Sequence, residues 1–227
     1  NTLNLKLAQV LIDSLIEKGG YDADDYLQRY IHFMLTPGQH RDTYVEECHR
    51  KFFTAYARGT APRKCAGRDI HVGGLAHVGV LCAFFAADAK AARAAVREHI
   101  NLTHRSQEVT SAGDALTRMI CAVATGADLR ESIFKHGADW FSKRKAELWS
   151  QEPDEVVIGR RVSPACYIAD AFPASLYLAW KYAHHFEVGF KYNGNVGDVP
   201  VRFNTAIYEQ IVKKAQHAVY AVIGGNP

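Results

Sequence analysis

The sequence contains no apolar run near the roughly 20 residues needed to cross a bilayer. Even its most apolar stretch, GGLAHVGVLCAFFAA, contains a histidine and ends quickly. The net charge is only +3, and the 27 Lys and Arg residues are spread along the chain without the aromatic-interleaved basic stripe of a nucleic-acid-binding surface. These absences predict that neither a membrane nor a nucleic acid is a partner.

The five cysteines are odd in number and widely spaced, with no C-x-x-C pair and no secretory leader in view. Such a pattern favours reduced thiols that serve mostly as small core residues. We therefore expect a cytoplasmic protein. The cysteines are Cys48, Cys65, Cys82, Cys121 and Cys166.

Familiar catalytic and metal-binding motifs are also absent, although the chain has 11 histidines. There is no H-E-x-x-H, no Cys/His quartet with zinc spacing and no G-x-S-x-G nucleophile elbow. Cys48 and His49 are neighbours on an expected helix and should face different ways, which disfavours a thiolate pair. A structural or surface role is the default for any single histidine, and the catalytic residues stay unassigned.

Helical periodicity dominates what the sequence does contain, and period-two alternation never exceeds a few residues. This pattern predicts one all-α domain of eight or nine helices over residues 1–227. Pro173 should break or kink the helix that contains it, Gly137 should bend another, and 155–162 is a weak candidate strand. The expected helices cover about residues 3–19, 22–36, 42–58, 75–86, 88–104, 106–126, 128–149, 163–186 and 204–222.

Two loops place glycine or polar residues beside helix ends. Gly73 and Gly74 lead into an apolar segment, so their amides could receive a phosphate, or they could form only a tight helix entry. Thr103 and His104 separate two expected helices, so their polar tips could face a cleft, or they could form only a capped turn.

A third loop, NGNVGD at 193–198, combines small residues with one carboxylate. Asp198 is a hard oxygen ligand suited to Mg²⁺, but a lone aspartate makes no Mg²⁺ site. Further carboxylates would have to come from elsewhere. The segment VPVRF that follows looks like the start of a helix.

Gly73-Gly74, Leu102-Thr103-His104, SPACYIADAFPASLYLAWKY and NGNVGD occur in the order seen in the ADP-ribosylglycohydrolase superfamily. The chain resembles its divergent branch near jellyfish J-class crystallins and selenoprotein J. The resemblance implies a compact orthogonal multi-helix bundle with two Mg²⁺ ions in a central cleft. There an ADP-ribosyl group would be released from a protein side chain or from a small ADP-ribose conjugate.

The resemblance also implies roles for individual residues. Gly73, Gly74, His104, Asn195 and Gly197 would bind the substrate. The metal ligand would be Asp198.

The chain departs from the pattern of this superfamily at both ends. Pro200 and Val201 stand where a second aspartate and a threonine of the metal shell are expected. The early Gly-Asp and Thr-Asp-Asp-Thr motifs would precede Leu3, so an N-terminal segment is expected to be missing. A further helix normally follows the Gly-Asp loop. Asp198 and Val199 are therefore expected to lie too far apart for a peptide bond.

Three functions stay open. The first is Mg²⁺-dependent hydrolysis of an ADP-ribosyl glycosidic bond, which an incomplete ligand set would impair. The second keeps the fold without catalysis, as a crystallin-like structural protein or a ligand-binding pseudoenzyme. The third is an unrelated helical interaction module.

Overall fold

The structure is a computed structural model that describes residues 3–40, 44–85, 88–163 and 165–185. Ten α-helices and no β-strand occur in these ranges, which confirms the predicted all-α class. The helices are α1 (Leu3–Lys18), α2 (Ala23–Leu35), α3 (Glu47–Ala57), α4 (Val78–Phe84), α5 (Ala89–Asn101), α6 (Gln107–Ala124), α7 (Leu129–His136), α8 (Lys143–Trp149), α9 (Asp154–Val156) and α10 (Ile168–Lys181), with 3-10 turns η1 (Pro62–Lys64) and η2 (Val72–Leu75) and the π-helical segment η3 (Val157–Arg161).

Side-chain caps start four helices at positions that the sequence indicates. Asp22, Asp88, Ser106 and Asp128 each accept hydrogen bonds from main-chain amides of the first turn that follows. Such caps satisfy amides that have no partner inside the helix. For α2 the cap is Asp22 rather than Asp24.

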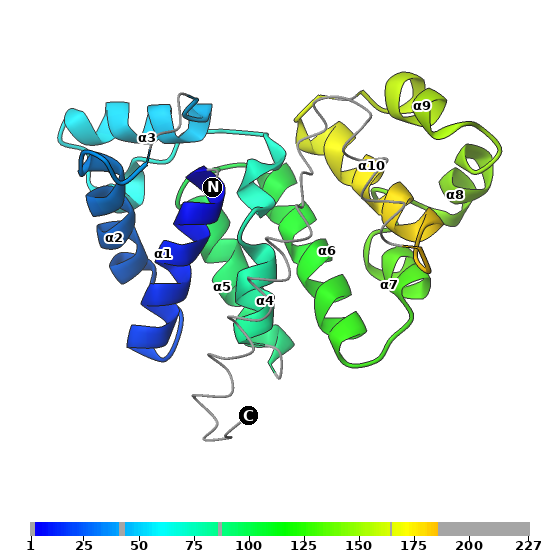
Figure 1. Ribbon diagram of the computed structural model, residues 1–227, viewed down its shortest axis with the longest axis horizontal. Coiled ribbons are helices and arrows are strands. Elements are labelled where there is room, and N and C mark those ends of the chain that lie inside the picture. Colours follow the sequence, from blue (N-terminus) through cyan, green and yellow to red (C-terminus); the bar gives the residue numbers. More distant parts are fainter. Residues whose placement is uncertain (1–2, 41–43, 86–87, 164, 186–227) are drawn as a thin grey trace.

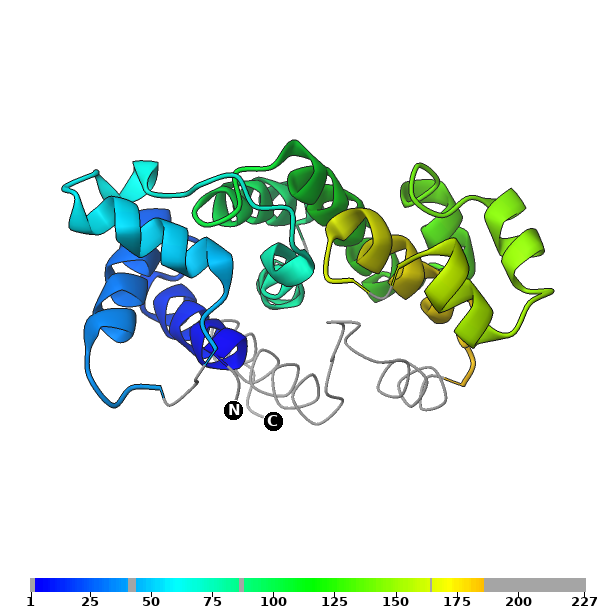
Figure 2. The ribbon, with the colours of Figure 1, turned by 90° about the horizontal axis from the view of Figure 1, so that it is seen from above.

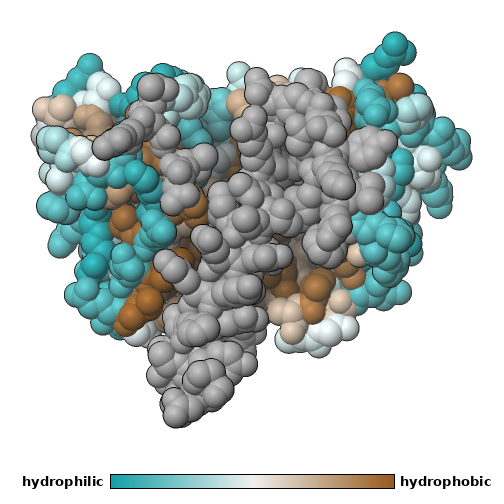
Figure 3. All heavy atoms as spheres, in the orientation of Figure 1, coloured by the Kyte–Doolittle hydropathy of each residue, from teal (hydrophilic) through white to brown (hydrophobic). Residues whose placement is uncertain are grey.

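The helices lie in three groups along the longest axis (Figures 1 and 2). α1 to α3 lie at one end, α4 to α6 in the middle, and α7 to α10 at the other end. α6 contacts α4, α5, α7 and α10, so it connects the middle group to the far end. Hydrophilic side chains cover the outer faces of both ends (Figure 3), while the apolar faces pack inward.

Several expected helix boundaries are wrong, and α4 begins at Val78 rather than at 75. α3 begins at Glu47 rather than near 42, and 44–46 approach it without helical structure. The single helix expected over 128–149 is two helices, α7 and α8. Gly137 ends α7, and its carbonyl accepts from the amides of Trp140 and Phe141 in a tight turn. Ser142 then caps α8.

The weak strand expected at 155–162 is also wrong. Its amides bond locally, since the Val157 amide donates to Pro153 O at 3.1 Å and the Val162 amide donates to Val157 O at 3.0 Å. Val157 and Ile158, which lie in η3, are buried. Among the described residues no strand is available for them to pair with.

The helix expected from Ser163 begins later, at Ile168, and runs through Pro173 without a break. An internal proline removes one hydrogen bond and costs about 3 kcal/mol. Apolar burial offsets this cost, because α10 packs against α6 and α7 and buries Phe172, Pro173 and Leu176. The helix expected at 204–222 and the 198/199 join lie outside the described residues.

A buried carboxylate ties α9 to α10. Asp154 is 4% exposed and accepts hydrogen bonds from Tyr177 Oη at 2.6 Å, Lys181 Nζ at 2.6 Å and Tyr182 Oη at 2.5 Å. Burial alone would raise the pKa of Asp154, but these donors bring it below its ordinary value. The charged carboxylate therefore stabilises the packing of α9 on α10.

We predict that Asp154→Ala lowers the free energy of unfolding by about 2–3 kcal/mol, because it leaves three donors without their acceptor. The exposed neighbour Glu155 supplies the control, and Glu155→Ala should change stability by no more than about 0.5 kcal/mol. Urea denaturation of both variants checks this. Equal stabilities would show that the Asp154 contacts contribute nothing.

Candidate functional site

An extended segment, 67–72, passes between two loops and positions most of the site. On one side the Arg105 amide donates to Gly67 O at 3.0 Å. On the other, the Val72 amide donates to Cys166 O and the Ile168 amide donates to Ile70 O, both at 2.8 Å. These main-chain bonds hold residues 69 and 71 close to the turn that follows α5.

Gly73 and Gly74 follow in η2, where neighbouring side chains leave no room for a Cβ atom. A Cβ on Gly74 would lie 2.6 Å from Val109 Cγ1 and 3.0 Å from His104 Cγ. One on Gly73 would lie 2.6 Å from Glu46 Oε2. The glycines therefore allow a carboxylate and an imidazole to pack directly on the main chain.

These groups enclose a cavity of about 20 Å³, room for about one water molecule. The structure thus brings together Gly73, Gly74 and His104, three residues that sequence reasoning selected. The cavity is much smaller than an ADP-ribosyl group. Its lining residues are Asn4, Tyr26, Glu46, His49, Gly73, Gly74, His77, His99, Ile100, Thr103 and His104.

Asn195, Gly197 and Asp198 lie outside the described residues. Substrate contact by the two glycines and the imidazole, and metal binding by Asp198, therefore stay predictions. His104 is only 3% exposed, and its ring faces the Gly74 main chain.

A chain of buried hydrogen bonds forms one wall of the cavity. His77 Nε2 lies 3.1 Å from Asn4 O, which can only accept, so His77 Nδ1 is the acceptor for His99 Nε2 at 2.9 Å. His99 Nδ1 then accepts from Tyr21 Oη at 3.1 Å. Burial lowers the pKa of His77 to about 4 and that of His99 well below its ordinary value. Both rings are therefore neutral at physiological pH.

Three other buried side chains each use one atom within the protein and leave a second without a partner. Tyr30 Oη bonds His49 Nδ1 at 2.8 Å, and Thr103 Oγ1 bonds His104 Nδ1 at 2.9 Å. Asp69 Oδ1 accepts from the amide and the ring of His71, at 2.9 and 2.6 Å. His49 Nε2, His104 Nε2 and Asp69 Oδ2 are buried with no hydrogen-bond partner.

Charge distinguishes these three groups. Burial lowers the pKa of His49 and of His104 to about 4, so both are neutral. Burial alone would raise the pKa of Asp69, but the hydrogen bonds from His71 lower it, and the carboxylate stays ionised. The site therefore presents one buried negative charge beside two neutral imidazole rings, each with an unpartnered Nε2.

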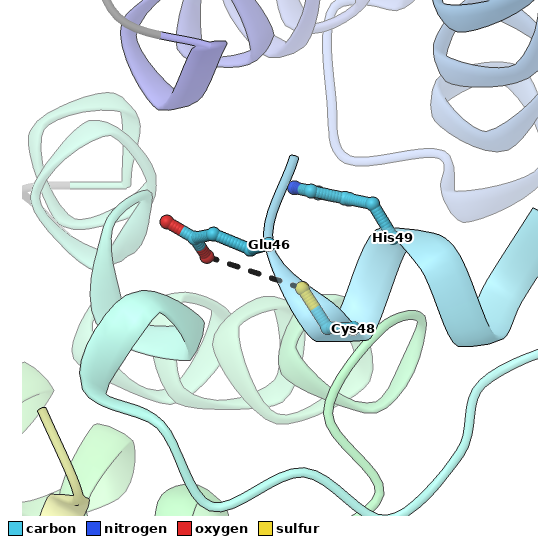
Figure 4. A group of neighbouring side chains, drawn as sticks. All are labelled: Glu46, Cys48 and His49. Atoms are coloured by element: carbon cyan, nitrogen blue, oxygen red, sulfur yellow. Dashed lines mark hydrogen bonds between the residues drawn. The ribbon is translucent and has the colours of Figure 1, made fainter. Parts of the chain in front are cut away.

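Cys48 lies in the first turn of α3, between Glu46 and His49 (Figure 4). Its sulfur points toward Glu46 Oε2 at 4.0 Å, and ligand atoms of all three residues lie within 4.8 Å of one another. The expectation that Cys48 and His49 face apart is therefore wrong. No thiolate pair results, because burial raises the pKa of the Cys48 thiol and keeps it protonated.

Three groups of described residues could hold a metal ion, and each contains a cysteine or a histidine. Mg²⁺ prefers an octahedron of oxygen ligands, whereas thiolate and imidazole suit transition metals. Sequence reasoning missed these groups, although DIH lies in the same loop as Gly73 and could have indicated Asp69. The groups are Glu46-Cys48-His49, Cys48-Asp69-His104 and Glu47-Asp69-His71.

A family model, ADP-ribosylglycohydrolase, matches residues 2–199. The chain belongs to the ADP-ribosylglycohydrolase family. Members act on ADP-ribosylated substrates and are generally metal-dependent, which agrees with a site that has candidate metal ligands. Among curated proteins, no match to this chain was found. Placement in the crystallin and selenoprotein branch stays a prediction.

Within the described part of this ADP-ribosylglycohydrolase-family chain, no helix is long and apolar enough to span a membrane.

The close approach at Gly74 predicts a cost for a single methyl group. We expect Gly74→Ala to lower the free energy of unfolding by about 1–3 kcal/mol, because Val109 is stiff and the His104 ring is buried. A Cβ on Gly79 in α4 would meet nothing within 4 Å, so Gly79→Ala should be neutral or stabilising by up to about 1 kcal/mol. Urea denaturation measures both, and an unharmed Gly74→Ala protein would contradict the packing argument.

The buried histidines also predict a pH dependence. His77 has a folded pKa of about 4 and an unfolded pKa of about 6.5, so the unfolded chain binds its proton first. The contribution of neutral His77 to the free energy of unfolding should be fully present above pH 6.5 and should be lost as the pH falls toward 4. This contribution is up to about 3 kcal/mol. Denaturant titrations at several pH values should show that the free energy of unfolding depends less steeply on pH between 6.5 and 4 in His77→Gln than in wild type. Parallel slopes would exclude this contribution.

Proposed function

We propose that this chain hydrolyses the glycosidic bond between ADP-ribose and a protein side chain or small acceptor, using Mg²⁺. Membership of the family over residues 2–199 carries the proposal. The meeting of Gly73, Gly74 and His104 around one cavity supports it.

Each site residue has a proposed part. The main chain at Gly73 and Gly74 would face the diphosphate or ribose. His104 would support Gly74 from the protein side, because its ring is buried against that glycine. Asn195 and Gly197 would complete the substrate-binding residues, and Asp198 would bind metal.

The described residues do not fit a Mg²⁺ shell, because none of their candidate groups consists only of oxygen donors. The necessary carboxylates would have to come from residues outside the described ranges, with Asp198 among them. When bound, the ions would supply orientation of the ribose and activation of a water molecule. We derive no step of the reaction through them.

A second candidate, a non-catalytic protein on the same fold, is favoured by two observations. The described cavity holds about one water molecule, and the donor groups contain cysteine or histidine. A structural protein needs neither an open cleft nor a complete Mg²⁺ shell. A cytoplasmic location is also proposed, since no disulfide joins Cys48, Cys65, Cys82 and Cys121, all of which are buried.

The deciding experiment incubates the intact chain with two probes, an N-linked ADP-ribosyl-guanidine and an O-linked ADP-ribosyl-serine peptide. Released ADP-ribose is measured by chromatography with and without Mg²⁺. We expect release from at least one probe only with Mg²⁺. Asp198→Asn should lower the rate at least about 100-fold, whereas Asp13→Asn, at an exposed position of α1, should not.

Ligand binding separates the two candidates further. ADP-ribose with Mg²⁺ at 100 times the Kd should stabilise the protein by about 2.7 kcal/mol. Stabilisation without release would favour a pseudoenzyme. Neither stabilisation nor release would overturn the proposed hydrolase and favour the structural protein.

A further inference from the structure

We propose that Cys48, Asp69 and His104 form a Zn²⁺ site that is separate from the proposed Mg²⁺ site. The three side chains come from α3, from segment 67–72 and from the turn after α5. Their ligand atoms lie within 4.8 Å of one another. The proposal goes beyond the hydrolase and does not depend on it.

Two of the three ligands have an atom that nothing in the described structure satisfies. His104 Nε2 and Asp69 Oδ2 are buried and have no hydrogen-bond partner. Both residues are 3% exposed, and Cys48 is 1% exposed. Buried polar atoms without partners are rare and call for an explanation, such as an ion.

The remaining atoms of these ligands are held as the outer shell of a metal site would hold them. Thr103 Oγ1 and His104 Nδ1 share a hydrogen bond of 2.9 Å, and in the tautomer in which Nδ1–H donates to the hydroxyl the lone pair of His104 is on Nε2. Asp69 Oδ1 accepts two hydrogen bonds from His71, which leaves Oδ2 available. Partners of this kind fix the tautomer and orientation of ligands in metalloproteins.

The donor set selects a borderline-soft cation. Zn²⁺ binds thiolate, imidazole and carboxylate, commonly as a tetrahedron whose ligand atoms lie about 3.5 Å apart. His104 Nε2 lies 3.9 Å from the Asp69 carboxylate, measured to Oδ1, so the two side chains are within reach of one ion. Zn²⁺ binding would release the Cys48 proton to solvent, since a coordinating thiol is deprotonated.

His49 is a candidate for the fourth ligand. His49 Nε2 is buried and without a partner, and a ligand atom of His49 lies within 4.8 Å of the Cys48 sulfur. A water molecule in the adjacent cavity of about 20 Å³ could occupy the same position. Three protein ligands with an open or water-filled fourth position are a known zinc arrangement.

The test uses the intact chain, stripped of metal by a chelator and titrated with Zn²⁺ in a calorimeter. Co²⁺ serves as a spectroscopic probe, because a cobalt-thiolate bond has a charge-transfer absorption. We expect one equivalent of Zn²⁺ to bind in the presence of excess Mg²⁺. We also expect a thiolate-to-cobalt band with one equivalent of Co²⁺.

Variants assign the ligands. Cys48→Ala should abolish the band and weaken Zn²⁺ binding at least about 100-fold. Cys82→Ala, which removes another buried thiol, should leave both unchanged. Asp69→Asn keeps an acceptor for the His71 donors, so it should weaken binding at least about 10-fold while circular dichroism shows an intact fold.

Three results would overturn the proposal. They are no stoichiometric Zn²⁺ binding, a cobalt-thiolate band that survives Cys48→Ala, and equal Zn²⁺ affinity in wild type and Asp69→Asn. The first would mean that ordered water, rather than a metal, satisfies the buried atoms, and the other two would mean that the metal binds at other residues.

Discussion

The arrangement of the site depends on the main-chain hydrogen bonds of segment 67–72. Gly67 O accepts from Arg105, while Ile70 O and the Val72 amide bond the loop before α10. Residues far apart in sequence are thereby held in register, as in a short sheet, inside a helical protein. Without this segment, Asp69 would have no reason to lie beside the turn after α5, and the η2 glycines would not reach His104.

Burial then determines which groups carry charge. His77, His99 and His104 are almost completely enclosed, so the neutral imidazole is favoured. In His77 and His99 each ring nitrogen acts as a donor or as an acceptor. Asp69 is equally buried but receives two hydrogen bonds from His71. The Asp69 carboxylate is thus the buried charge of the site. Such an arrangement is costly in isolation and attracts a cation.

Local chemistry explains why much of the fold could be predicted. Capping side chains such as Asp88 and Ser106 act within one turn, so their sequence positions mark helix starts directly. Pro173 shows where such local prediction fails, because the burial of α10 against α6 and α7 outweighs the tendency of proline to break a helix. The false strand at 155–162 has the same origin, since its apolar residues needed a partner strand that sequence alone cannot supply.

The candidate site was predictable only in part, for a related reason. Gly73, Gly74 and His104 stand out because glycine pairs and polar turns are unusual between apolar helices. No comparable sequence pattern surrounds Cys48 or Asp69. Their relation depends on the packing of α3 against segment 67–72, which no spacing in the sequence records.

His104 connects the two proposed sites through one ring. Its carbon edge supports Gly74, with His104 Cγ 3.0 Å from the Gly74 Cβ position, while Nε2 faces Asp69 at 3.9 Å. A cation on Nε2 would hold the ring in the plane against which Gly74 packs. Because linkage is reciprocal, any effect of Zn²⁺ on the affinity for ADP-ribose must equal the effect of ADP-ribose on the affinity for Zn²⁺. The His104 ring is thus a direct physical link between the proposed zinc site and the proposed substrate contact at Gly74.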